Sequence, residues 1–106
     1  MGYDLLILDP RGSARIDSVE LLPQELGALV EEAASLGLSG LAQLPSYWGG
    51  EERQLSPADV RSLDQELVQV ERRARRGTDL EGAVRKLRRL VDVAVRTGRP
   101  LEIVPD

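Results

Sequence analysis

The sequence predicts an α+β fold in which a small sheet of two or three strands is covered by an antiparallel helical hairpin and one further helix. Two observations predict it. Short apolar runs stand near both ends of the chain, at Tyr3–Leu8 and Leu101–Val104, and both are too short for helices. Between them, three segments of helical periodicity have start and stop signals. At 106 residues the chain fits one domain, residues 1–106.

The N-terminal run Tyr3–Leu8 is apolar on both faces, which is typical of a central or covered strand. It ends at Asp9-Pro10-Arg11-Gly12, which suits a type I turn. Residues Arg15–Glu20 are a weak candidate for the returning strand of a hairpin. The C-terminal run Leu101–Val104 is bounded by prolines, and we expect it to pair with Tyr3–Leu8, because neither strand would be stable alone.

The first helix is predicted to begin at Pro23, where a proline costs no internal hydrogen bond, and to end before Gly37. Its apolar positions have helical spacing: Leu26, Leu29, Val30, Ala33 and Leu36. We expect its outward side to carry Glu25, Glu31 and Glu32. Residues 38–55 are the least regular stretch, with a possible helical turn around Leu41–Leu44.

The helical hairpin has the clearest signals. Ser56 is a candidate N-cap for a helix that we expect to run to Gly77. Its apolar stripe is Val60, Leu63, Leu67, Val70 and Ala74. Thr78 and Glu81 form a capping-box pattern for the next helix, which ends at Gly98. Because the link between them is so short, the two helices should be antiparallel.

Composition excludes several chemistries. The chain contains no Cys and no His, so thiolate metal sites and the commonest general base are both absent. No phosphate-binding or dinucleotide-binding glycine motif occurs. We therefore expect no enzyme activity, no metal and no cofactor. No apolar run is long enough to span a membrane and no signal peptide is evident, which favours a cytoplasmic protein.

Charge is distributed unevenly along the chain. Residues 1–71 carry 13 acidic and 4 basic side chains, whereas residues 72–99 carry 3 acidic and 10 basic ones. The basic residues Arg72, Arg73, Arg85 and Arg89 are candidates for binding nucleic acid or another polyanion. The alternative, which we favour, is that these arginines pair within the molecule with acidic residues near 20–32.

Two of the three aromatic residues, Tyr47 and Trp48, lie together before Gly49-Gly50. Such residues are preferred anchors of protein interfaces. Trp48 could equally fill the aliphatic core, and the sequence leaves both interpretations open.

The opening Tyr3-Asp4-Leu5-Leu6-Ile7-Leu8-Asp9-Pro10 resembles that of a group of small bacterial proteins, some of which are suspected immunity proteins of toxin systems. The resemblance implies a context of protein binding and no particular site. With the acidic first two-thirds of the chain, it predicts a non-catalytic protein-binding module, of immunity or regulatory type, for a partner such as a basic toxin. The candidate binding residues are Tyr47, Trp48, Glu25, Glu31 and Glu32. Polyanion binding and homo-oligomerisation are the alternatives.

Overall fold

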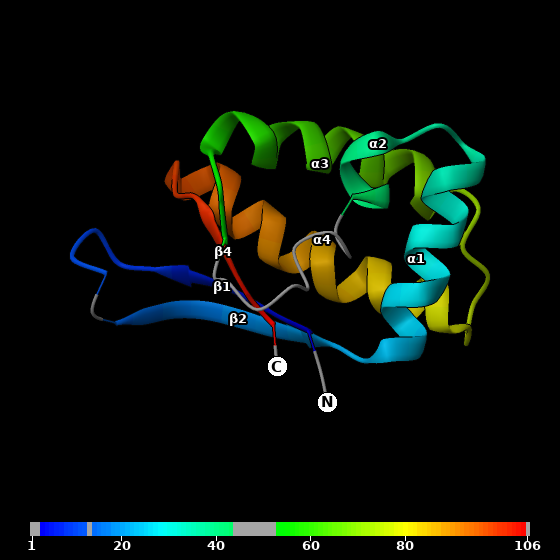
Figure 1. The fold of residues 1–106 in the computed structure, drawn as a ribbon, viewed down its shortest axis with the longest axis horizontal. Coiled ribbons are helices and arrows are strands. Elements are labelled where there is room, and N and C mark those ends of the chain that lie inside the picture. The colour runs from blue at the N-terminus through cyan, green and yellow to red at the C-terminus, as the bar shows by residue number, and fades with distance from the viewer. Residues whose placement is uncertain (1–2, 13, 44–52, 106) are drawn as a thin grey trace.

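The computed structural model describes residues 3–12, 14–43 and 53–105. The chain has the predicted α+β class, with a sheet on one side and the three long helices α1, α3 and α4 on the other (Figure 1). The strands are β1 (Tyr3–Leu8), β2 (Arg15–Leu21), β3 (Arg53–Leu55) and β4 (Leu101–Pro105). The helices are α1 (Pro23–Ser35), α2 (Ser39–Ala42), α3 (Pro57–Glu71) and α4 (Asp79–Thr97).

The sheet is antiparallel with the order β2-β1-β4-β3. The predicted pairing of the two terminal strands is confirmed, since Asp4 lies opposite Val104 and Leu6 opposite Glu102. The hairpin between β1 and β2 also forms, with Leu5 opposite Val19. The expected two or three strands were too few, because the short strand β3 adds to the far edge of β4.

Strand β3 lies within the stretch that the sequence left irregular. Three residues are too few to show an alternating pattern, so only the tertiary pairing with β4 identifies the strand. In the same stretch, the turn expected around Leu41–Leu44 appears as α2, two residues earlier.

The helix starts follow the local signals. Ser56 Oγ accepts a hydrogen bond from the Asp59 N–H at 3.2 Å, and Thr78 Oγ1 accepts one from the Glu81 N–H at 3.2 Å. The Glu81 carboxylate bonds to the N–H of Gly77 at 2.7 Å, one residue before the position expected for a capping box. Both helices of the hairpin therefore begin where the sequence predicted.

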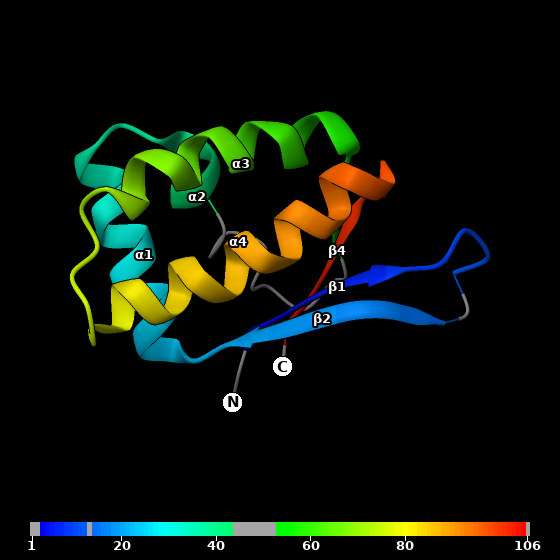
Figure 2. The same cartoon turned by 180° about the vertical axis from the view of Figure 1, so that it is seen from behind.

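The predicted end of α3 was wrong. The helix ends at Glu71 instead of continuing to Gly77. The basic residues that follow therefore belong to the connection between α3 and α4, which we call the hairpin connection (residues 72–77). The two helices that this connection joins run in opposite directions (Figure 2).

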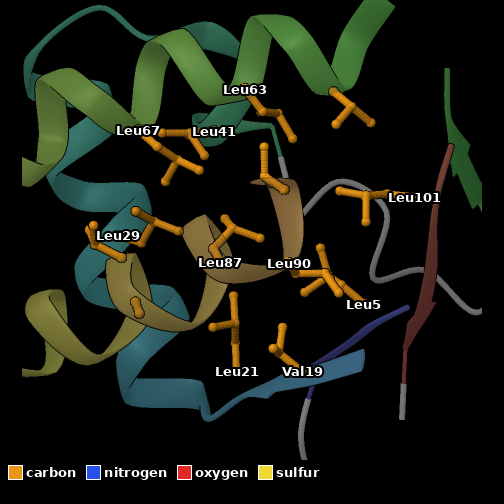
Figure 3. Close-up of a cluster of buried hydrophobic side chains, with 14 of the residues drawn as sticks. Leu5, Val19, Leu21, Leu29, Leu41, Leu63, Leu67, Leu87, Leu90 and Leu101 are labelled. Atoms are coloured by element: carbon orange, nitrogen blue, oxygen red, sulfur yellow. The ribbon is translucent and has the colours of Figure 1, made fainter. Parts of the chain in front are cut away.

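An aliphatic core joins the sheet to the helices (Figure 3). Strand residues at odd positions, such as Leu5, Val19 and Leu101, point toward Leu87 and Leu90 of α4. Further from the sheet, Leu41, Leu63 and Leu67 close the core between α2, α3 and α4. Because strand side chains alternate between faces, the even positions of the sheet must lie on the side away from these helices.

Candidate functional site

The acidic residues expected on the outside of α1 have three different environments. Glu31 is exposed as predicted, and Glu32 is partly buried beside Arg73, with which it forms an ion pair. Glu25 is 7% exposed, so its predicted outward position was wrong. The spacing in the sequence could have placed Glu25 on the buried face, because Glu25 precedes the core residues Leu29 and Ala33 by one and two helical turns.

Glu25 joins the start of α1 to α4. Its Oε1 accepts hydrogen bonds from the Leu22 N–H at 2.9 Å and from Lys86 Nζ at 2.7 Å. Burial by itself would raise the pKa of Glu25. The bonds from Lys86 and Leu22, with the charges of Lys86 and Arg85, outweigh burial and hold that pKa below its ordinary value. Glu25 therefore caps and fastens α1, a structural role.

Tyr47 and Trp48 lie outside the described residues. The question whether Trp48 belongs to the core or to an interface therefore stays open, and their part in partner binding stays a prediction.

Most of the predicted polyanion-binding arginines have carboxylate partners. Arg73 pairs with Glu32, Arg85 with Glu81 and Arg89 with Asp17. The same holds for further basic residues of α4, whose ion pairs are Lys86–Glu25, Arg88–Glu71 and Arg96–Asp92. Internal pairing, the alternative favoured from the sequence, therefore accounts for most of the basic hairpin. The acidic partners lie on β2, α3 and α4 as well as on α1.

The hairpin connection is the exception. Arg72, Arg75 and Arg76 are exposed, and within the described residues none of them has an ion pair. Beside the connection lies an open hollow of about 380 Å³ between α3 and α4. It is lined by Glu71, Ala74, Glu81, Val84, Arg85 and Arg88. The charged residues of this lining pair with one another, so the hollow offers no unpaired cation to a ligand.

A third charged surface was not predicted. On the sheet face away from the helices, Glu20 of β2, Asp4 of β1 and Val104 of β4 lie in one row. The next row holds Ser18, Leu6, Glu102 and Gln54. We call Asp4, Glu20 and Glu102, with Val104 among them, the outer acidic face. Leu6 lies between its carboxylates and is buried.

The charges of the outer acidic face have no counter-ion among the side chains that the structure describes. Glu102 accepts a hydrogen bond from the Gln54 amide at 2.7 Å, but none of the three carboxylates forms an ion pair with a described residue. Asp4 and Glu20 lie directly opposite each other, an arrangement that destabilises an antiparallel pair. The sequence could have revealed this face, because each of the three predicted strands has an acidic residue at an even position, whereas its odd positions supply the core.

The described residues were also compared with the requirements of a metal site and of a membrane span. No group of three or more acidic residues gathers there in a way that could hold a metal ion. Every buried side-chain nitrogen or oxygen in this part of the chain has a hydrogen-bond partner. Among these same residues, no helix combines the length and apolar character needed to cross a membrane.

Comparison of the chain with protein-family models, with curated proteins and with solved structures finds no match in any of the three.

Proposed function

We propose that the chain is a non-catalytic protein-binding module whose outer acidic face docks onto a basic surface of another protein. The observation that carries the proposal is the cross-strand pair of Asp4 and Glu20. Two carboxylates directly opposite each other cost stability, and a cationic partner would remove that cost on binding. The two residues could be replaced by neutral ones without loss of a contact that the described structure makes.

The chemistry of this face suits a protein partner. Glu20 is exposed, while Asp4, Glu102 and Val104 are half-buried, so that carboxylates surround a small apolar area. Facing charges of opposite sign accelerate association and select against acidic partners. An immunity-type protein that neutralises a basic toxin, such as a nuclease, is the form of this function that we favour, and the cytoplasm is its proposed compartment.

The test begins with the proteins encoded beside the gene, because an immunity protein and its toxin are expected to be neighbours. Each is co-expressed with the chain, and any complex is measured by titration calorimetry. Asp4→Asn/Glu20→Gln should weaken the complex at least about tenfold, or about 1.4 kcal/mol. Binding of the wild type should also weaken as salt is added, because salt screens exposed charges.

The matched control is Glu31→Gln/Asp64→Asn, which removes the same charge from mid-helix positions elsewhere. It should leave affinity nearly unchanged. Equal losses of affinity in both variants would show that only the net charge of the chain matters, and would contradict the proposal. A loss confined to the control would transfer the binding surface to the helices.

A second candidate function is the binding of nucleic acid or another polyanion. One observation favours it: Arg72, Arg75 and Arg76 are exposed together in the hairpin connection. We rank it second because the connection is flanked by the carboxylates of Glu71 and Asp79. Tight binding of a labelled oligonucleotide at physiological salt, lost in Arg72→Ala/Arg75→Ala/Arg76→Ala, would reverse this ranking.

A further inference from the structure

Among the described strands, β2 forms one edge of the sheet, because in the order β2-β1-β4-β3 it pairs only with β1. In an antiparallel pair, every second residue of an edge strand directs its N–H and C=O away from the partner strand. Such a row of unpaired groups is a template for adding another strand, and proteins usually block it. We therefore expect the outward-directed backbone N–H and C=O groups of β2 to be blocked in some way.

Side chains from α4 occupy this edge. Arg89 donates a hydrogen bond to the carbonyl of Ser18 at 3.1 Å, and Lys86 donates one to the carbonyl of Glu20 at 3.2 Å. The N–H of Ser18 is bonded at 2.8 Å to the carboxylate of Asp17, which in turn is held by Arg89 at 2.9 and 3.1 Å. Three of the four groups that residues 18 and 20 direct to the edge are thus taken by side chains.

The spacing of the two cations matches the strand. Lys86 and Arg89 are three residues apart on α4 and so lie on one side of the helix. Ser18 and Glu20 are two residues apart and direct their carbonyls to the same edge. Each cation is also fixed by a carboxylate, Lys86 by Glu25 and Arg89 by Asp17. We call Lys86 and Arg89 the edge-bonding pair.

We propose that the edge-bonding pair prevents the chain from joining a second copy of itself through β2. This inference concerns the edge of the strand and is independent of the proposed function of the outer acidic face.

The geometry of the β2 edge suits the β2 strand of a second copy of the chain. Two copies related by a two-fold axis would bring their β2 strands together antiparallel, with Ser18 opposite Ser18 of the second copy. In that register, pairing would use the N–H and C=O of both Ser18 and Glu20, and side chains now occupy three of these four groups. Ile16, which is 47% exposed, lies beside this edge at the point where the register between β2 and β1 shifts.

The test removes the edge-bonding pair with Lys86→Met/Arg89→Ala and measures mass by sedimentation over low to high micromolar concentrations. The wild type should stay monomeric, whereas the variant should form dimers or larger species as concentration rises. The matched control is Arg85→Ala/Arg96→Ala, because it removes the same charge from the same helix and breaks only ion pairs within α4. This control should stay monomeric.

Two further variants make the result decisive. Arg89→Ala alone leaves the Lys86–Glu25 bond in place and should still associate, which covers the case that the double variant does not fold. Adding Ser18→Pro to the associating variant should restore the monomer, because proline lacks the N–H needed for edge pairing while the bonds of β2 to β1 involve its neighbours. A folded variant that stays monomeric, or one that associates despite Ser18→Pro, would overturn the proposal.

Discussion

Strand β2 carries acidic residues in two opposite situations. Toward α4, Asp17 is paired with Arg89, and Glu25 just after the strand is paired with Lys86. On the outer acidic face, Glu20 lies opposite Asp4, and neither carboxylate forms an ion pair with a side chain that the structure describes. The number of charged residues in a segment therefore does not predict their effect on stability, which depends on how the charges are paired. Paired charges fasten the helices to the sheet, whereas unpaired like charges weaken the sheet and are, in our proposal, retained for binding.

The largest expected effect is on the paired side. Glu25→Gln should lower the free energy of unfolding by about 2 kcal/mol, because it leaves Lys86 without its carboxylate and weakens the cap at Leu22. Denaturant titration measures this. Glu31→Gln, an exposed residue of the same helix, should stay within about 0.5 kcal/mol of the wild type. Equal losses of stability in the two variants would show that the paired Glu25 contributes no more than an exposed carboxylate.

A smaller part of the stability that Glu25 contributes should depend on pH. The pKa of Glu25 is lower in the folded chain than its ordinary value of 4.5, so the unfolded chain binds a proton first as pH falls. The stability that Glu25 contributes is therefore complete above pH 4.5 and is lost as pH falls through the folded pKa. Unfolding titrations of the wild type and Glu25→Gln at a series of pH values should converge toward the acid end. A constant difference would contradict this.

Two glycines test how tightly Glu25 is held. Gly27→Ala should raise stability by about 1 kcal/mol, since alanine favours the helix and a Cβ there meets nothing within 4 Å. At Gly82 a Cβ would lie 2.7 Å from Glu25 Oε2, so Gly82→Ala should gain less or lose stability. Thermal unfolding compares the two. An equal gain would show that the Glu25 carboxylate can move at little cost.

The smallest expected effect is on the outer acidic face. Asp4→Asn/Glu20→Gln should raise the free energy of unfolding by about 0.5 kcal/mol, because it removes repulsion between residues directly opposite each other. Denaturant titration at low and high salt measures it, and the gain should shrink when salt screens the wild-type repulsion. A loss of stability would mean that these carboxylates have a structural role like that of Glu25.

Much of the fold could be predicted from short-range signals. The caps at Ser56 and Thr78 lie where predicted, and the pairing of Tyr3–Leu8 with the C-terminal strand follows from two apolar runs that need each other. The candidate site was predicted less well. Glu25 was placed on the wrong side of α1, and the carboxylates of Asp4, Glu20 and Glu102 were not grouped, because strand order and register were unknown.

Local signals in the sequence specify where the helices begin, which positions form the core and that the first and last strands pair. Caps and apolar periodicity act over three or four residues, so a single segment contains the whole signal. The pairing of charges, in contrast, depends on the tertiary fold. Lys86 lies 61 residues from Glu25, and Arg89 lies 72 residues from Asp17. No local pattern specifies such a contact, because it depends on how α4 packs against β2 and α1.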